Sequence, residues 1–534
     1  MSTSAAPRRP SSPSRSLLAS GLLLAVACGD SAGTTATEGQ GSSTGTTAAD
    51  PTTTTTDGPG STTTDATAGS GTLSGTTGDT TDPTTAPTTD STDSGASATG
   101  TTGDTTTGDA TTGTTGETTG ETTGGADDLP TSCLDADFPV VAPLCGAGGP
   151  PCLLKRDELI SDQLKFRNDM PAIALRGDCG PAVIYSEAVG GYFGFYAERT
   201  GPGAWTVEPT PMPIATGSLE IDPATDEAFA LTDDGAFGVT LSTRSGGVWK
   251  TTGALEGMHH TRAPQLVRGA DGKLHVGHID ADQTALYHVF DGAWSMSQVD
   301  KAADIHVRLA LGPAAAPRLT YWSSKEATWK LYFAAPPAEP ELVTPLQSNV
   351  LDRAHTSLAL AGADATPWVL AARKQADQVH HDLVLLHRTG PAKWAEETLV
   401  AEDPAEATCA LDPQGPGEQC MYDYTRYHPL TLFTAGDQVR AVYTAIRSQG
   451  TLVAECEMMP FPICFWTPLS DESTAELRVA WPGSQPEEHA VVAADVFTDR
   501  ATGRLDPGGN MHLAFYDYVP GTPDPVVRYL AIGE

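Results

Sequence analysis

One unit of the chain carries the clearest fold signal: residues 263–299 read APQLVRGADGKLHVGHIDADQTALYHVFDGAWSMSQV. Turns at Asp271-Gly272 and Asp291-Gly292 separate short runs, Leu274–Ile279 and Ala285–Phe290 among them, in which apolar residues alternate or cluster. Period-2 patterning between Asp-Gly turns is a strand and hairpin signal. The unit therefore predicts four strands in about 45 residues, which is the size of one propeller blade.

The unit repeats along the chain. A Gly-x-Trp turn recurs about every 45 residues, at Trp205, Trp249 and Trp294, and the related run Gly390-Pro391-Ala392-Lys393-Trp394 follows about two periods later. The strand template fits six further segments, near residues 172–196, 219–241, 309–333, 358–387, 430–456 and 491–531. We therefore expect an all-β fold, a seven-bladed β-propeller over residues 171–534 with an insertion at 402–425. We expect a Cys-rich N-terminal cap over residues 131–170 before it. A six-bladed ring with a partial closing unit is the alternative, and a pair of β-sandwiches would not produce this period.

The turn Asp291-Gly292-Ala293-Trp294 resembles the Asp-box of sialidase-like (BNR-like) propellers, a Ser-x-Asp-x-Gly-x-x-Trp hairpin. It keeps the Asp, Gly and Trp, with a spacing that differs by one residue. The resemblance implies the propeller fold. It implies nothing about sialidase chemistry, because the Asp-box is itself structural.

The first 27 residues have the layout of a signal peptide. Arg8, Arg9 and Arg15 precede the apolar run 17–27, which is too short to span a bilayer. The end of that run, Ala25-Val26-Ala27-Cys28, resembles the lipobox of bacterial lipoproteins. That resemblance implies cleavage before Cys28, lipid on its sulfur and, with Gly29 following, sorting to the outer membrane. An ordinary secretory leader is the alternative.

Residues 28–130 are rich in Thr, Gly and Asp and contain no Lys or Arg. Such a segment has too few apolar side chains to offset the entropy of ordering, so we expect a disordered tether. This Thr/Gly/Asp composition resembles that of the stalks of myxobacterial surface lipoproteins. We accordingly expect a monomer in the cell envelope that contacts the membrane through its lipid anchor and displays its globular part at the surface.

The chain has nine cysteines, which leaves eight if Cys28 is lipidated. An even number in an exported protein favours disulfides. Two pairs are close enough to staple local loops and the other four residues pair among themselves in an open order: Cys409/Cys420, Cys456/Cys464, and Cys133, Cys145, Cys152 and Cys179. Zinc is the alternative, but the spacings are too long for a C-x₂₋₄-C knuckle. We expect neither metal nor cofactor.

The formal net charge is −36. An acidic surface cannot displace the counterions of phosphate backbones, which excludes nucleic acid as a partner. Neutral or cationic partners, surface proteins and sugars remain compatible with this charge.

Polar residues recur just before the first strand of several units, where a propeller's innermost strand begins at the mouth of the axial channel. We expect a ligand-binding group there. Guanidinium groups fork onto carboxylate or sulfate oxygens and imidazoles move protons or bind metals. The group comprises Arg262, His306, Arg353, His355, Arg426 and His428. Strand capping around a water-filled channel is the structural alternative.

A weaker catalytic alternative rests on His260 and His278, which flank one hairpin. Their placement loosely resembles propeller polysaccharide lyases, and that resemblance implies proton abstraction beside a uronate carboxylate. No nucleophile-elbow, zinc-protease or phosphate-loop motif accompanies them. The sequence thus favours a lipid-anchored binding or scaffold module rather than an enzyme. The alternative is a secreted polysaccharide lyase or glycoside hydrolase acting on acidic glycans.

Overall fold

The computed structural model describes Cys133 and residues 142–534, except for gaps at 163–169, 189–191, 212–213, 234–237, 256–263, 302, 304, 325–328, 349–354, 376–379, 405–408, 410–412, 414, 459–461 and 519–524. Cys28, the predicted signal peptide 1–27 and the predicted tether 28–130 therefore lie outside the described residues. Across the described ranges, no helix is long and apolar enough to cross a membrane.

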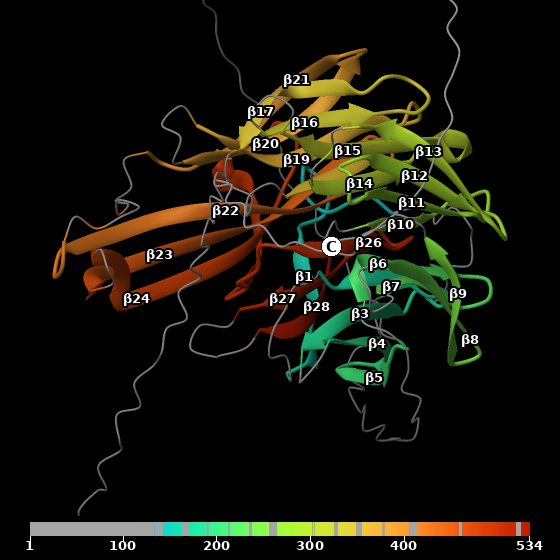
Figure 1. Ribbon diagram of the computed structural model, residues 1–534, viewed down its shortest axis with the longest axis horizontal. Coiled ribbons are helices and arrows are strands. Elements are labelled where there is room, and N and C mark those ends of the chain that lie inside the picture. Colours follow the sequence, from blue (N-terminus) through green and yellow to red (C-terminus); the bar gives the residue numbers. More distant parts are fainter. Residues whose placement is uncertain are drawn as a thin grey trace, which may run out of the picture. The chain divides into compact units, whose positions relative to one another are not determined.

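The described strands form seven four-stranded antiparallel sheets, which confirms the propeller and its seven blades (Figure 1). Blades 1 to 3 contain, from the innermost strand outward, β2 (Ala172–Leu175), β3 (Pro181–Ala188), β4 (Tyr192–Gly201), β5 (Ala204–Pro209); β6 (Ile214–Asp222), β7 (Glu227–Asp233), β8 (Val239–Ser245), β9 (Val248–Leu255); and β10 (Gln265–Arg268), β11 (Leu274–Ile279), β12 (Ala285–Phe290), β13 (Trp294–Asp300). The third of these blades is the unit 263–299, and its strands follow the predicted runs.

The remaining blades have the same order. Blades 4 to 6 contain β14 (Ile305–Leu311), β15 (Pro317–Ser323), β16 (Trp329–Ala334), β17 (Glu341–Ser348); β18 (Thr356–Ala361), β19 (Thr366–Lys374), β20 (His381–Gly390), β21 (Lys393–Ala401); and β22 (Gln419–Ala435), β23 (Gln438–Met458), β24 (Pro462–Ala480), β25 (Ala490–Ala494). Blade 7 contains β26 (Ala501–Leu505), β27 (Met511–Asp517), β28 (Val526–Gly533) and β1 (Leu153–Ser161). Single 3₁₀ turns, Pro313–Ala315 and Pro486–Glu488, lie in blades 4 and 6.

The ring closes through strands from both ends of the chain. The innermost strands contact one another in the order β2, β6, β10, β14, β18, β22, β26 and back to β2. β1 pairs with β28, so residues 153–161, which we expected in an N-terminal cap (131–170), form the outermost strand of blade 7. The segment 491–495, expected as the first strand of the last unit, overlaps β25, the outermost strand of blade 6.

The core lies between neighbouring sheets. Tyr287 of blade 3 and Tyr321 of blade 4 belong to one buried cluster, and Phe433 of blade 6 and Phe515 of blade 7 belong to another. The side chains of a strand alternate between the two faces of its sheet. Because neighbouring blades pack against both faces, the side chains on both faces are apolar. This explains the short apolar runs of the sequence.

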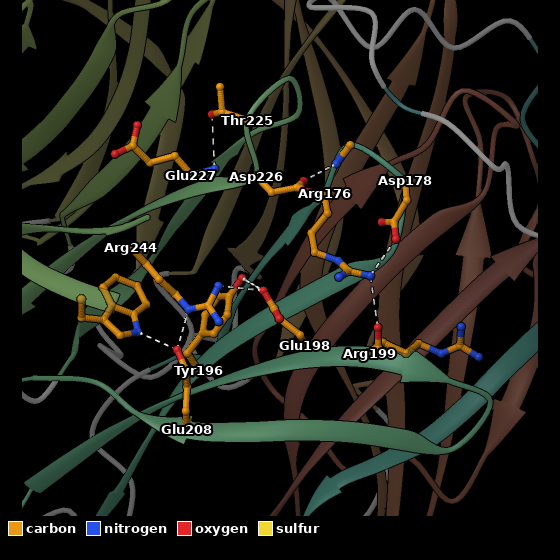
Figure 2. A network of polar contacts seen from close by, with 12 residues as sticks. Arg176, Asp178, Tyr196, Glu198, Arg199, Glu208, Thr225, Asp226, Glu227 and Arg244 are labelled. Atoms are coloured by element: carbon orange, nitrogen blue, oxygen red, sulfur yellow. Dashed lines mark hydrogen bonds and ion pairs between the residues drawn. The ribbon is translucent and has the colours of Figure 1, made fainter. Parts of the chain in front are cut away.

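The tryptophan of the Gly-x-Trp turn ties blades 1 and 2 each to the blade before it. In blade 2, Arg244 and Trp249 are cross-strand partners, and both side chains hydrogen-bond the Glu208 carboxylate of β5 in blade 1. Arg244 also donates to Glu198 at 3.0 Å and stacks over the Tyr196 ring (Figure 2). We call this set of Arg, Trp and the preceding blade's Glu the inter-blade clamp.

The clamp occurs again at the ring closure. Arg199 and Trp205, cross-strand partners in blade 1, both donate to Glu158 of β1, with Nε1 of Trp205 at 2.9 Å. Blade 5 repeats the arginine contact, because Arg388 faces Trp394 and pairs with Glu341 of blade 4. The Gly-x-Trp turn therefore marks a structural contact between blades.

Four disulfides staple the domain, which confirms the predicted pairs Cys409–Cys420 and Cys456–Cys464. The pairing left open is Cys133–Cys179 and Cys145–Cys152. Cys133–Cys179 joins the N-terminal segment to blade 1. The turn around Cys145 is held on blade 6, because Arg440 donates to the carbonyl oxygens of Leu144 and Gly146 at 3.2 and 3.1 Å.

Three strands of blade 6 are much longer than the others. β22, β23 and β24 have 17, 21 and 19 residues, and their outer parts pair in register beyond the propeller core. Figure 1 shows them as three long neighbouring ribbons in orange and red. We call residues 419–429 with their partners on β23 and β24 the arm; it includes the end of the predicted insertion 402–425.

Candidate axial binding site

The innermost strands enclose a cavity of about 390 Å³ along the propeller axis. Every blade contributes to its wall. Lining residues, one per blade from blade 1 to blade 7, are Ile173, Glu220, Arg268, Arg308, Ser357, Leu430 and Arg504. All innermost strands run the same way along the axis, because every blade has the same antiparallel order. We call the end where they begin the mouth and the opposite end the far end.

The charges toward the far end are paired. Arg268, the last residue of β10, forms an ion pair with Asp222 at 3.0 Å, and Arg504 of β26 pairs with Glu220 of β6. Burial raises the pKa of the Glu220 carboxyl, and the Arg504 guanidinium opposes that shift. These pairs link blades 2, 3 and 7 across the channel and leave little charge to offer a ligand.

The charge nearer the mouth differs. Arg308, the fourth residue of β14, donates to two backbone carbonyl oxygens, those of Thr356 at 2.7 Å and Val307 at 3.1 Å. Within the described part of the chain, no carboxylate pairs with it. Burial and the nearby Arg500 guanidinium lower the pKa of Arg308 to about 10. The group therefore remains cationic at neutral pH, and its charge is unbalanced.

His306 lies at the mouth in a backbone conformation that is uncommon outside glycine. Its φ is 53°, at an irregularity in the pairing of β14 with β15 between Ile305 and Arg308. Such conformations cost about 1–3 kcal/mol and cluster at functional sites. The turn brings its ring to 4.7 Å from the His355 ring, measured between centroids. Burial, then Arg308 and Arg500, lower the pKa of His306 to about 3, so its imidazole is neutral.

The structure brings some predicted site residues together and separates others. His306 and His355 touch at the mouth, whereas Arg426 stacks over the Tyr424 ring at 4.5 Å on the arm. His428 lies on β22, close to where that strand enters the propeller. Arg262, Arg353 and His260 lie outside the described residues. The ligand-binding role of the whole group stays a prediction.

Sequence reasoning missed the channel's own charges. Arg308, Glu220, Arg268 and Arg504 lie within the innermost strands, while we had considered the residues before them. The available signal was a charged side chain inside a short apolar run, as in Val307-Arg308-Leu309 or Leu219-Glu220-Ile221. Such a residue would be costly to bury unless it faces a cavity or a partner.

His278, the other catalytic candidate, lies inside blade 3. It is fully buried on β11, and its ring centroid is 4.8 Å from that of His288 on β12. Burial lowers the pKa of His278 to about 3, with His288 adding to the effect, and burial lowers the pKa of His288 to about 4. A neutral, enclosed imidazole is placed for packing between strands rather than for contact with a polymer.

These two histidines predict acid sensitivity. At pH values between the folded pKa values and the ordinary histidine pKa near 6.5, the unfolded chain binds more protons than the folded one. Lowering the pH from 6.5 to 4.5 therefore destabilises the fold. The loss is about 1.4 kcal/mol per pH unit and histidine. Urea unfolding at three pH values should show at least this slope, and His278→Leu with His288→Leu should reduce it by the share of these two residues, because His306 still contributes. An equal slope in both proteins would contradict the assignment.

No protein-family model and no curated protein matches this sequence. Similar solved structures include polysaccharide lyase Uly1, with 11% identity, a TM-score of 0.38, and 73% of this chain and 92% of that chain covered. The Dos1 propeller shows 9% identity, a TM-score of 0.38 and coverages of 72% and 95%. The Aleuria aurantia lectin with Fucα1-6GlcNAc shows 10% identity and a TM-score of 0.30, with 58% of this chain and 97% of that chain covered. Likenesses this distant carry no information on ligand or activity.

Proposed function

We propose that the propeller is a binding module of the cell envelope whose axial channel takes up an acidic group of a glycan at its mouth. The observation that carries the proposal is the unbalanced Arg308 guanidinium inside the channel. A buried cation without a carboxylate is costly, and an incoming carboxylate or sulfate would balance it. Arg500, whose charge also acts on Arg308, would be a second cation, although it is already paired with Asp499 at 3.6 Å.

A uronate or sulfated sugar suits the remaining groups of the mouth. Neutral imidazoles such as His306 can both donate and accept hydrogen bonds, as sugar hydroxyls require. Ligand pockets commonly measure about 300–1,000 Å³, and this cavity of about 390 Å³ falls within that range. The acidic surface of the domain disfavours broad attraction of polyanions, so recognition would depend on this local group.

Binding is better supported than catalysis. A general base works best when its pKa lies near the working pH. His306, whose pKa is held near 3, would accept a proton poorly at neutral pH. The lyase alternative would therefore require the ligand's own charge to raise that pKa substantially. We propose the binding module first and keep glycan cleavage as an outcome of the test.

The location is part of the same proposal. Four disulfides support folding in an oxidising compartment. The lipobox-like run before Cys28 supports a lipid anchor, with the tether holding the propeller away from the membrane. An outer-membrane, surface-exposed lipoprotein would meet acidic polysaccharides directly.

The test is calorimetric titration of the full-length protein in detergent with a galacturonate dimer and with sulfated disaccharides. Charge-assisted hydrogen bonds contribute roughly 1.5–3 kcal/mol each, so Arg308→Met should weaken binding about 10- to 100-fold. Arg447→Met, which removes an exposed arginine of the arm, is the control and should bind normally. Absence of binding by the wild-type protein, or equal binding by Arg308→Met, would overturn the proposal. Release of unsaturated product would favour the lyase.

A further inference from the structure

The arm continues the wall of the channel outward from the mouth. β22 is the innermost strand of blade 6, and its residues 430–432 line the cavity. The backbone N–H of Leu432 donates to the Ser357 hydroxyl at 2.9 Å, which places Leu432 level with the second residue of β18. Residues 419–429 precede that level, so they extend past His355 on the mouth side.

One face of this extension carries aromatic and cationic side chains in alternation. Every second position of this segment shares one face of the strand, and that face carries Tyr422, Tyr424, Arg426 and His428. The rings of Tyr422 and Tyr424 are 5.7 Å apart, and the Arg426 guanidinium lies 4.5 Å from the Tyr424 centroid. Tyr424 and Arg426 are both partly exposed.

This face leads toward the cationic mouth. Thr444, the cross-strand partner of His428, donates its hydroxyl to the backbone oxygen of Thr498 at 2.6 Å. Thr498 lies two residues before Arg500, whose charge acts on both Arg308 and His306. The face of Tyr424 and Arg426 is therefore linked, through one hydrogen bond and a short segment, to the group that would hold the ligand's acid.

We infer that Tyr424 and Arg426 form a second subsite for the same acidic glycan, which makes the site specific for chains rather than single sugars. The inference rests on the proposed function. An aromatic face packs against the C–H face of a sugar ring, and Arg426 offers a fork to a carboxylate or sulfate. Six residues of strand separate Tyr424 from Leu430, about 20 Å at 3.3 Å per residue. A ligand must be several sugars long to occupy both subsites.

Chain length is the variable that tests the inference. Full-length protein is titrated with a galacturonate dimer and a galacturonate octamer. Wild-type protein should bind the octamer at least tenfold more tightly, and Tyr424→Leu with Arg426→Gln should remove that advantage while dimer affinity stays unchanged. Arg308→Met should weaken the binding of both ligands.

The control changes the opposite face of the same arm. Asp423 and Arg447 form an exposed ion pair there, and Asp423→Asn with Arg447→Gln should leave both affinities unchanged. Near-ultraviolet circular dichroism and an intact Cys409–Cys420 bond establish that each variant is folded. Octamer and dimer affinities that are equal in the wild type, or an octamer preference that survives in the Tyr424/Arg426 variant, would overturn the subsite alone. Failure of both ligands to bind would overturn the proposed function together with it.

Discussion

Replacing Glu158 with glutamine should lower the free energy of unfolding by about 3–5 kcal/mol, the usual effect of removing one partner of a buried ion pair. Glu158 and Arg199 are exposed by only 7% and 5%, and the carboxylate also accepts from Nε1 of Trp205. The amide retains the shape of the side chain but leaves the Arg199 cation buried without a counter-charge. Because this clamp holds β1 against blade 1, its loss should open the ring at its closing strand.

Chemical denaturation measures the effect, and hydrogen exchange locates it. Protection should fall first in β1 and β28, which pair with each other. Asp423→Asn, which breaks the exposed pair with Arg447, is the matched control and should leave the unfolding midpoint unchanged. A double replacement, Glu158→Leu with Arg199→Met, should regain much of the loss because it removes both buried charges. A Glu158→Gln protein as stable as wild type would show that the clamp does not secure the closure.

The propeller could be predicted because its signals are local. Each blade buries both faces of its inner strands, so these strands leave short apolar runs, and many of the tight hairpins leave Gly-containing turns. Residues 263–299 became β10 to β13 for this reason. The Trp of the Gly-x-Trp turn could be read as a repeat marker, but its partner could not. Glu158 lies 47 residues before Trp205 and belongs to another blade, and local pattern does not encode such contacts.

The strand that closes the ring could not be predicted either, because its pairing is also long-range. The segment 153–161, LLKRDELIS, shows no apolar–polar alternation, and its partner β28 lies at the other end of the domain. The first strand of the last unit was also misplaced, because the segment 491–495 overlaps β25 of blade 6 and the innermost strand of blade 7 is instead β26. Strand existence follows from sequence, whereas membership of a sheet follows from long-range pairing.

The candidate site remains a prediction, and the structure brings together only some of the residues predicted for it. His306 and His355 meet as expected, since residues before equivalent strands come together around an axis. Arg426 lies on the arm rather than at the mouth. β22 begins at Gln419, far outside the propeller, so the position before the apolar run is in the middle of that strand and not at its start. Arg308 was missed because its neighbours suggested a buried strand, and only the cavity shows that a charge can be accommodated there.

If Cys28 carries the proposed lipid, Cys28→Ser should abolish membrane anchoring through that lipid. Lipid is transferred to a thiol, and serine has no sulfur on which a thioether can form. The run 17–27 is too short to hold the chain in a bilayer by itself as a spanning helix. Each buried methylene of an acyl chain contributes about 0.8 kcal/mol, so loss of the acyl chains removes the binding energy of the anchor. The variant should therefore accumulate as unprocessed precursor or be released.

Metabolic labelling with an alkyne fatty acid, followed by membrane fractionation, measures both consequences. Wild-type protein should carry the label and sediment with membranes, while Cys28→Ser carries none. Replacing Cys456 and Cys464 together with serine is the control, because these cysteines are bonded to each other and should not affect labelling. Equal labelling of wild type and Cys28→Ser would contradict the lipobox assignment. The propeller would then lack the anchor that places its channel mouth at the cell surface, and only the channel's own chemistry would still support glycan binding.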